Sequence, residues 1–303
     1  MSLLSVIIPN RNRGRLLTRL FDPVRDFCNQ NAGWSAEIIV VDDASTDDSV
    51  AALKQQAEAG YPLPITVLPH ASPKGAAASR NDGIRAAKGE FLLFADSDAE
   101  FDAACLKKLA DGIEGADVTF PKVIRANGEI ISPITDYEEK YCMNSMLFLM
   151  RRGALDRMGH YFDEFMQIYG EDSDFFMRAQ VLGVRIRYVP SAVAYHPVRD
   201  TFSEVAFYQG TKNGVYIILK LGGLVKYRIP FSLYLPYHLT INILIGVTKR
   251  HFHKLRPCGI RYTATRRRLL TLYFRALASV AGQLGNILRL RRDLRARLRA
   301  RAA

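Results

Sequence analysis

The sequence lacks the cysteine patterns of disulfide-stabilised and zinc-binding proteins. Its four cysteines, Cys28, Cys105, Cys142 and Cys258, are widely separated, and no two of them form a Cys-x-x-Cys pair. Scattered cysteines of this kind suit a reducing compartment. We therefore expect the fold to depend on its hydrophobic core, and 303 residues are enough for one large core and an appended region.

Three common glycine-based site motifs are also missing. No Gly-x-Gly-x-x-Gly follows the first apolar run, and neither Gly-x-x-x-x-Gly-Lys-Ser/Thr nor Gly-x-Ser-x-Gly occurs. These absences exclude the usual dinucleotide-binding, P-loop and α/β-hydrolase sites. The first ten residues lack the basic segment and long apolar stretch of a secretory signal, so we expect them to form a strand.

Acidic residues are scarce at one end of the chain. Residues 249–303 hold 16 of the 42 lysines and arginines but a single acid, Asp293. Such asymmetry indicates a polyanionic partner, either an anionic membrane surface or nucleic acid. Because this region shows no nucleic-acid-binding motif and no aromatic stacking platform, we favour the membrane and expect no nucleic-acid partner. A basic-tail nucleic-acid binder stays a minor alternative.

Short apolar runs alternate with helical patterns along the first hundred residues. The runs that predict buried strands are Ser5–Pro9, Glu37–Val41, Ile65–Leu68 and Phe91–Phe94. Because a helix is expected between consecutive strands, this order predicts a parallel, doubly wound α/β sheet. Later strands between residues 118 and 197 alternate with helices and predict that the complete sheet is mixed.

Local signals predict where helices begin and end. Pro23 lies inside the first helical pattern and predicts a break or kink there. Ser45 or Thr46 is expected to cap the second helix, and Asn127-Gly128 predicts a turn between two short strands. The later helices are expected over residues 75–87, 102–113, 152–158, 175–182, 201–221, 262–283 and 286–301.

Two aspartates follow the apolar run Phe91–Phe94 directly. Asp96 and Asp98 are one residue apart, at the carboxyl end of a predicted buried strand, where open α/β sheets bind ligands. Such a pair can hold a hard divalent cation, which can in turn hold a diphosphate. The alternative is an acidic turn that caps a helix near Asp102. A second acidic loop, Asp42–Asp48, ends another strand at the same edge and favours the metal interpretation.

Five segments, in order and at suitable spacing, resemble the motifs of family 2 glycosyltransferases with the GT-A fold. They are Ser5–Asn12 (SVIIPNRN), Val40–Asp48 (VVDDASTDD), Gly75–Gly89 (GAAASRNDGIRAAKG), Phe94–Asp98 (FADSD, a DXD motif) and Gly170–Phe175 (GEDSDF). The resemblance implies a Rossmann-like mixed sheet flanked by helices. It implies a GT-A catalytic domain over residues 1–200, with a nucleotide-sugar half of about 1–100 and an acceptor half of about 101–200.

The resemblance also implies roles in binding the donor. Asp43 would hydrogen-bond the nucleotide base, and Pro9 would lie against it. Arg11 stands where the family often has an aromatic residue that stacks on uracil, and its guanidinium could stack instead. This departure leaves the base open, with a UDP-sugar favoured. Lys74 or Arg80 would meet the diphosphate.

The remaining roles concern the metal and the chemistry. Asp98 would bind Mg²⁺ or Mn²⁺, Asp96 would face the ribose or the metal, and His196 would contact the metal or the diphosphate. Asp172 would be the general base, with Glu171 beside it. One base acting directly on the acceptor implies inversion at the anomeric carbon. A histidine or acidic helix start without catalytic function is the alternative for these residues.

The resemblance therefore implies a metal-dependent, hexosyltransferase-type enzyme that moves a sugar from a nucleotide diphosphate to a hydroxyl. The acceptor would be a glycan or a lipid-linked molecule, as in cell-surface polysaccharide or glycoconjugate synthesis. A metal offsets the charge of the leaving diphosphate, and a positioned carboxylate can take the proton of the acceptor. A nucleotide-sugar-binding protein without transfer activity is the alternative.

The region 201–303 is expected to be helical, basic and membrane-associating. Residues 229–248 carry no formal charge, but Pro230 and Pro236 make them a poor spanning helix. We favour an interfacial or re-entrant element over a buried core helix, and a core helix over a true span. The leucine and arginine pattern of residues 284–301 predicts an amphipathic helix on anionic lipid, and the alternative is a solvated, partly disordered basic tail. These features predict a cytoplasmic protein held peripherally at the inner face of the cell membrane.

Overall fold

The structure is a computed structural model, and it divides into two compact units. The first comprises Met1–Gln167 with Gly183–Pro197, and the second comprises Ile168–Leu182 with Val198–Ala303. The residues that the structure describes are 1–125, 130–132, 145–159, 161–197, 201–222, 224, 231–253, 256–262 and 264–302.

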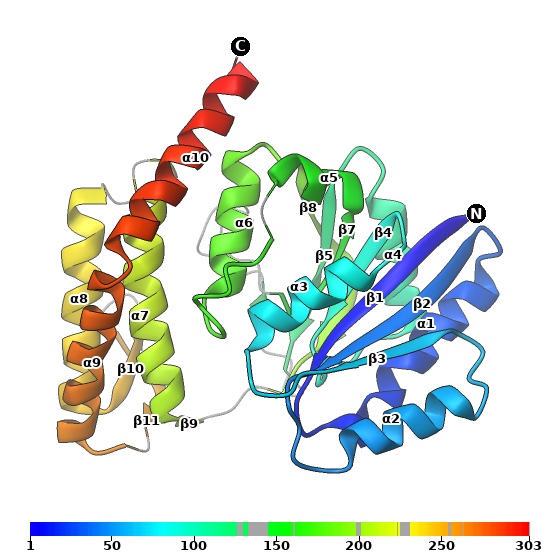
Figure 1. Cartoon of the computed structure of the whole chain (residues 1–303), viewed down its shortest axis with the longest axis horizontal. Helices are drawn as coiled ribbons and strands as arrows, with labels where there is room; N and C mark the ends of the chain where they lie inside the picture. The colour runs from blue at the N-terminus through cyan, green and yellow to red at the C-terminus, as the bar shows by residue number, and fades with distance from the viewer. Residues whose placement is uncertain are drawn as a thin grey trace. The chain divides into compact units, whose positions relative to one another are not determined.

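A mixed eight-stranded sheet forms the centre of the first unit, in the order β3-β2-β1-β4-β7-β5-β6, with β8 paired to β5 (Figure 1). The strands are β1 (Ser2–Asn10), β2 (Trp34–Asp42), β3 (Ile65–Pro69), β4 (Phe91–Ala95), β5 (Val118–Ile124), β6 (Ile130–Ser132), β7 (Leu147–Arg151) and β8 (Ile186–Tyr195). Strands β1 to β4 are parallel, whereas β7 runs antiparallel to β4 and β5. The predicted mixed sheet is thus confirmed.

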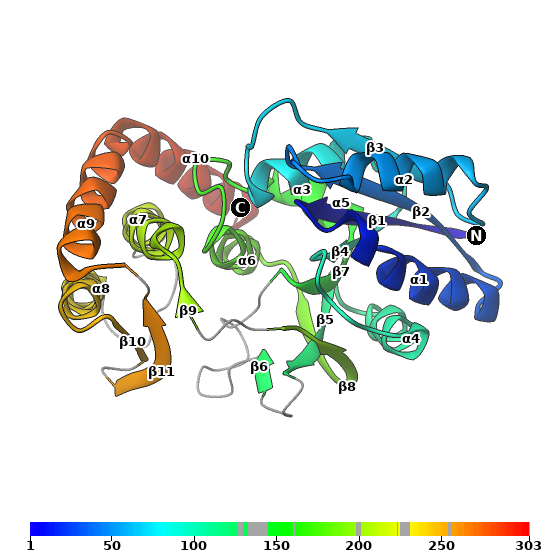
Figure 2. The ribbon, with the colours of Figure 1, turned by 90° about the horizontal axis from the view of Figure 1, so that it is seen from below.

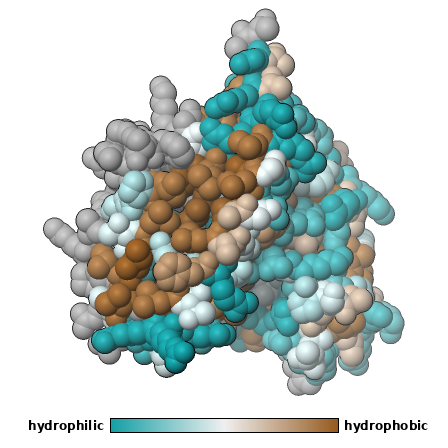
Figure 3. All heavy atoms as spheres, turned by 60° about the vertical axis from the view of Figure 1, so that its left-hand side comes forward, coloured by the Kyte–Doolittle hydropathy of each residue, from teal (hydrophilic) through white to brown (hydrophobic). Residues whose placement is uncertain are grey.

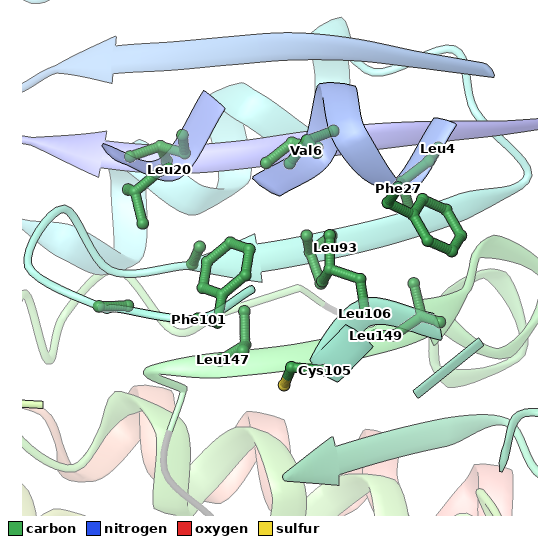
Figure 4. Close-up of a cluster of buried hydrophobic side chains, with 14 of the residues drawn as sticks. Leu4, Val6, Leu20, Phe27, Leu93, Phe101, Cys105, Leu106, Leu147 and Leu149 are labelled. Carbon is green, nitrogen blue, oxygen red and sulfur yellow. The ribbon is translucent and has the colours of Figure 1, made fainter. Parts of the chain in front are cut away.

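Helices cover both faces of this sheet. They are α1 (Thr18–Gln30), α2 (Ser49–Glu58), α3 (Ala76–Ala86), α4 (Ala103–Gly112) and α5 (Arg152–Met158), with a short 3-10 helix η1 (Gly14–Leu16) before α1. Figures 1 and 2 show α3 on one face and α1 and α4 on the other. A dense hydrophobic core lies between the sheet and the two helices α1 and α4. It includes Leu4, Val6, Leu20, Leu93 and Leu106 (Figure 4).

The small residues of α3 let this helix approach the sheet closely. Gly83 shows why, because a Cβ at this position would lie 2.4 Å from Cγ2 of Ile7 on β1. Ala77 and Ala78 are also buried in the helix. The close approach fixes α3 beside the carboxyl ends of the parallel strands, and this places its polar residues at the candidate site.

The predicted break at Pro23 is wrong. Helix α1 runs from Thr18 to Gln30 with Pro23 inside it. The proline removes one backbone hydrogen bond, to the carbonyl of Arg19, and Arg19 is an exposed residue. Burial of Leu20, Phe21, Val24 and Phe27 against the sheet holds the helix together on both sides of the proline.

The predicted cap of the second helix is also wrong. Helix α2 begins at Ser49, after Asp48 in the N-cap position. The hydroxyl of Ser45 donates to Asp42 instead, at 2.5 Å. For the fourth helix, Asp102 is the N-cap, and its carboxylate accepts from the Cys105 backbone N–H at 2.7 Å. The alternative in which the Asp96–Asp98 turn supplies this cap is therefore excluded.

The second unit is mainly helical. Its elements are α6 (Glu171–Val181), β9 (Thr201–Phe202), α7 (Glu204–Leu221), α8 (Phe231–Thr248), β10 (Arg250–His253), β11 (Arg256–Tyr262), α9 (Arg266–Ala281) and α10 (Leu284–Ala302). Strand β11 pairs antiparallel with β10 and parallel with β9. A separate core contains Phe207, Ile241, Ile245, Leu269 and Tyr273 from α7, α8 and α9.

Three helix starts differ from the sequence predictions. Helix α7 begins at Glu204, where the Ser203 hydroxyl accepts from the Ala206 N–H at 3.2 Å. Helix α9 begins at Arg266 behind the capping residue Thr265, because the residues before each cap form strand pairs. Helix α6 begins at Glu171, four residues earlier than expected. The predicted Asn127-Gly128 turn lies outside the described residues.

Helix α8 covers most of the uncharged run 229–248 and contains Pro236. In the part of the chain that the structure describes, no helix has both the length and the apolar character needed to cross a bilayer.

Candidate active site

Four parallel strands of the first unit end at one edge of the sheet. The chain leaves β1 at Asn10, β2 at Asp42, β3 at Pro69 and β4 at Ala95. Since parallel strands share one carboxyl edge, the four loops that follow bring their polar side chains together. Two neighbouring groups of residues form there, one around Asp43 and one around Asp98.

The two acids after β2 have different surroundings. Asp42 is fully buried and accepts from the Asn10 side chain at 2.8 Å and from the Ser45 N–H at 2.9 Å, so it holds the loop in shape. Asp43 points to the site edge and accepts from the backbone N–H groups of Lys74 (2.6 Å) and Gly75 (3.0 Å). Asp43 is the acid that, by the family resemblance, is expected to hydrogen-bond the nucleotide base.

The carboxylate of Asp43 is held in its charged form. Burial by itself raises its pKa, but the hydrogen bond from His70 and those from the two backbone N–H groups outweigh burial and lower the pKa. Arg11 lies nearby, with Nη1 4.0 Å from Oδ2 of Asp43. Pro9 is paired in register with Val41 on β2, one residue before the acidic loop. A strong, partly accessible acceptor thus stands beside an exposed guanidinium.

His70 is a site residue that the sequence analysis missed. It follows β3 directly, its Nδ1 lies 2.9 Å from Oδ1 of Asp43, and its Nε2 lies 2.8 Å from Oδ2 of Asp82 on α3. The ammonium of Lys74 is 3.8 Å from the same Asp82 oxygen. The signal that could have found His70 is its position, because a polar residue immediately after a parallel strand lies at the binding edge.

The second group contains Asp96, Asp98 and His196. One ligand atom from each lies within 4.8 Å of the others, and Nε2 of His196 is 3.1 Å from Oδ1 of Asp98. His196 reaches this position because an antiparallel bridge joins Tyr195, at the end of β8, to Glu100. The structure therefore joins a histidine from the end of the unit to the acidic turn after β4.

Two arginines hold the acidic turn. Arg80 is 3% exposed, and its Nη2 donates to Oδ1 of Asp96 at 2.8 Å. Arg13, from the loop after β1, forms an ion pair with Oδ2 of Asp98. Burial alone raises the pKa of Asp98, but His196 and Arg13 outweigh it and lower the pKa. Arg13 is the second site residue that the sequence analysis did not single out.

The donor atoms of this group fit a divalent cation. Two carboxylates and one imidazole within mutual reach are ligands that suit Mn²⁺, and carboxylates also suit Mg²⁺. The lowered pKa of Asp98 keeps that carboxylate charged at neutral pH. Since Arg13 already contacts Asp98, a cation would have to share or displace this guanidinium.

Glu171 and Asp172 belong to the second unit, at the start of α6. Glu171 is buried, whereas Asp172 is half-buried and its Oδ1 accepts from the Ser173 N–H at 2.7 Å. Asn213 on α7 fixes the loop before them, because its amide donates to the carbonyls of Ile168 (2.9 Å) and Tyr169 (2.7 Å). The more accessible of the two acids is therefore Asp172.

Comparison with family models gives two matches. A model described as Glycosyl transferase family 2 matches residues 5–168, and one described as Glycosyl transferase family group 2 matches residues 91–276. The pre-mycofactocin glycosyltransferase of Mycobacterium tuberculosis is 30% identical over 238 residues, which cover 68% of this chain and 46% of that protein. The chain thus spans about half the length of this curated relative.

Two solved structures have a similar fold. Residues 1–349 of Staphylococcus aureus TarS, in complex with UDP-GlcNAc, match with a TM-score of 0.60 and 20% identity over 98% of this chain and 88% of that one. The mannosyltransferase PcManGT of Pyrobaculum calidifontis, in complex with GDP-Man and Mn²⁺, matches with a TM-score of 0.59 and 16% identity over 97% and 85%. These similarities confirm the predicted GT-A fold and do not identify a substrate.

Proposed function

Since the chain belongs to glycosyl transferase family 2, we propose that it transfers a sugar from a nucleotide diphosphate to a hydroxyl of a glycan or lipid-linked acceptor, with inversion. The observation that carries the proposal is the gathering of Asp43, Asp96, Asp98 and His196 at one edge of the sheet. We also retain residues 1–200 as the catalytic domain and 201–303 as the membrane-associating region.

The donor would bind along the edge between the two groups of residues. Asp43, with Pro9 and Arg11 beside it, would hold the base, which we propose to be uracil, and Lys74 or Arg80 would meet the diphosphate. The support is the arrangement of charges at this edge, where the anionic acceptor Asp43 is accompanied by the cations Lys74 and Arg80. Arg80 also contacts Asp96, so it could orient this acid toward the ribose.

A divalent metal, Mn²⁺ or Mg²⁺, would be held by Asp98 and His196 with Asp96 at its edge. When bound, such an ion offsets the charge of the leaving diphosphate. The support is the donor set and its spacing, together with the charged state of Asp98. Arg13 would then be free to turn toward the diphosphate, because a guanidinium pairs well with phosphate oxygens.

Asp172 would take the proton of the attacking acceptor hydroxyl. A positioned carboxylate can provide a rate factor of about 10²–10⁴ in this way. The support is its place on the first turn of α6, where Asn213 fixes the preceding loop and Asp172 stays accessible. Glu171, which is buried beside Asp172, would contribute to the electrostatic environment of that base.

We further propose that the C-terminal helices rest on an anionic membrane at the cytoplasmic face, where a lipid-linked acceptor or a growing polysaccharide would be available. Figure 3 shows a continuous hydrophobic band on the side where Figure 1 has α8 and α9. Exposed apolar residues on α8, α9 and α10 support it: Ile243, Val247, Phe274, Leu284 and Leu288. The exposed arginines of α9 and α10 would contact the lipid phosphates.

The decisive experiment measures nucleotide release and sugar transfer from UDP- and GDP-sugars, with glycan and lipid-linked acceptors, in the presence of Mn²⁺ or Mg²⁺. Asp172→Asn should lower transfer by about 10²–10⁴ while nucleotide binding persists. Transfer that is undiminished in this variant would overturn the role of the base. Nucleotide-sugar binding without release or transfer would instead support a binding protein.

A further inference from the structure

The His70 side chain is buried, although it follows a strand at the edge where the candidate site lies. Its side chain is 5% exposed, and both ring nitrogens face carboxylate oxygens, of Asp43 at 2.9 Å and of Asp82 at 2.8 Å. The hydrogen bond from His70 lowers the pKa of Asp43, and an ionised carboxylate only accepts hydrogen bonds, so Nδ1 is the donor to Oδ1 of Asp43. The ring is thereby fixed between β3 and α3, and it cannot rotate without losing one of the two bonds.

This contact limits what Asp43 can still accept. A carboxylate oxygen offers about two acceptor positions. Oδ1 of Asp43 accepts from His70 and from the Lys74 N–H, so both of its positions are used. Oδ2 accepts from the Gly75 N–H alone among these partners, and it keeps one position open. The Asp43 side chain keeps 10% of its surface exposed, so the carboxylate is not fully enclosed.

The backbone N–H of Gly75, which also donates to Asp43, is held in place by the local backbone conformation. Gly75 has a φ of +94°, and a Cβ there would lie 2.8 Å from Cα of Gln167. Only glycine therefore fits where its N–H can reach Asp43. Basic side chains lie beside both acids. Arg85 and Lys74 pair with Asp82, and Arg11 approaches Oδ2 of Asp43.

We propose that His70 determines the base of the donor: by filling Oδ1 of Asp43, it leaves one acceptor position, which suits the single imide N–H of uracil. Guanine presents two adjacent donors, its ring N1–H and its 2-amino group, and a carboxylate receives both only when each oxygen has an open position. With Oδ1 filled, one guanine donor would be buried without a partner. This inference rests on the proposed function and extends it to the choice between UDP- and GDP-sugars.

The test is calorimetric titration of UDP and GDP into the full chain with Mn²⁺ present. Wild type should bind UDP about 10- to 100-fold more tightly than GDP, since an unpaired buried donor weakens binding by that factor. His70→Leu frees a position on Oδ1, so the two affinities should come within about threefold. If His70 only supported the fold, both nucleotides would weaken equally and the ratio would stay the same.

Two measurements keep the test decisive. Asp82→Asn removes the charge behind the imidazole but leaves the Nδ1 donor, so it should lower the melting temperature and keep the preference for UDP. If His70→Leu fails to fold, the wild-type titrations still test the inference. Wild-type protein that binds GDP as tightly as UDP would by itself overturn it. The absence of binding and transfer with both nucleotide types would instead contradict the proposed function.

Discussion

Arg13 forms an ion pair with Asp98, the residue that would bind the metal ion in the proposed function. Arg13 pairs with Oδ2 and His196 with Oδ1, so both oxygens of this carboxylate are engaged. A divalent cation at Asp98 must compete with the guanidinium for the same oxygens. We therefore expect Arg13 to weaken metal binding at this site in the absence of donor.

Arg13→Gln should raise the affinity for Mn²⁺ about fivefold, since removing a partly exposed ion pair is worth about 1 kcal/mol. The measurement is a titration of free Mn²⁺ by electron paramagnetic resonance without any nucleotide. Arg19→Gln is the matched control, because Arg19 pairs with Glu100 in an exposed position. Unchanged or weaker Mn²⁺ binding in Arg13→Gln would contradict the competition.

Asp117 is a buried acid with a structural role, and it gives a pH prediction. Arg157 donates to Oδ1 at 2.7 Å, and Arg185 donates to Oδ2 through its backbone N–H at 2.9 Å. Burial alone raises the pKa of Asp117, but the hydrogen bonds of Arg185 and Arg157 outweigh it and lower the pKa. The stabilisation is thus present above the unfolded pKa of about 3.9 and disappears as the pH falls through the lower folded pKa.

Asp117→Asn should lower the free energy of unfolding by about 1–2 kcal/mol at pH 7. The difference from wild type should shrink as the pH falls below about 4. Urea unfolding between pH 7 and pH 3 measures it. Asp111→Asn, which removes an exposed helical ion pair with Lys107, should change little. A difference that stays constant across this range would show that the charge of Asp117 does not matter.

At the scale of the element, helix α6 combines a catalytic candidate with a structural ion cluster. Asp174 is fully buried, and its carboxylate pairs with Nε of Arg178 at 2.7 Å and with Nζ of Lys220 on α7 at 2.8 Å. Burial raises the pKa of Asp174, and the two cations outweigh it and lower the pKa. This cluster joins α6 to α7 within the second unit, and Asp174 is two residues from Asp172 in the sequence.

Asp174→Asn should lower the free energy of unfolding by about 3–5 kcal/mol, because it takes the shared anion away from two buried cations. Asp172→Asn, on the same helix and half-buried, should cost less than about 1 kcal/mol. Thermal and urea unfolding of both variants measure the contrast. Equal stability of the two variants would contradict the structural role of Asp174.

The elements themselves were partly predictable. Apolar runs located β1 to β4 because a buried strand needs no long-range information to be recognised. Pro23 misled the sequence analysis, since burial of four neighbouring side chains outweighs one lost hydrogen bond. The start of α6 at Glu171 and of α9 at Arg266 depended on backbone conformation and strand pairing, which local residue patterns do not encode.

At the scale of the whole molecule, the apolar band and the arginines of the C-terminal helices predict binding to lipid. Phe274 is 65% exposed on α9, and Leu288 is 59% exposed on α10. Burying two such side chains in a bilayer interface contributes about 1.5–3 kcal/mol each. Electrostatic attraction to anionic lipid adds to this and weakens with salt.

The double variant Phe274→Ser/Leu288→Ser should reduce flotation with vesicles of anionic phospholipid at least tenfold. Wild-type flotation should fall when anionic lipid is replaced by neutral lipid or when the salt is raised. Leu16→Ser, an exposed apolar change in the first unit, is the control and should float like wild type. Equal flotation of the double variant would show that this band is not the membrane-binding surface.

The sequence by itself determined the α/β sheet, the acidic turns at its carboxyl edge and the family, because these follow from local apolar runs and from motifs in a fixed order. It also determined the basic C-terminal region through composition alone. Only the tertiary structure decided that His70 bridges Asp43 and Asp82, that Arg13 and His196 share Asp98, and that Asn213 holds the loop before Asp172. These partners are 12 to 98 residues apart in the chain, and strand order, close helix packing and hydrogen-bond geometry, none of which local pattern specifies, bring them together.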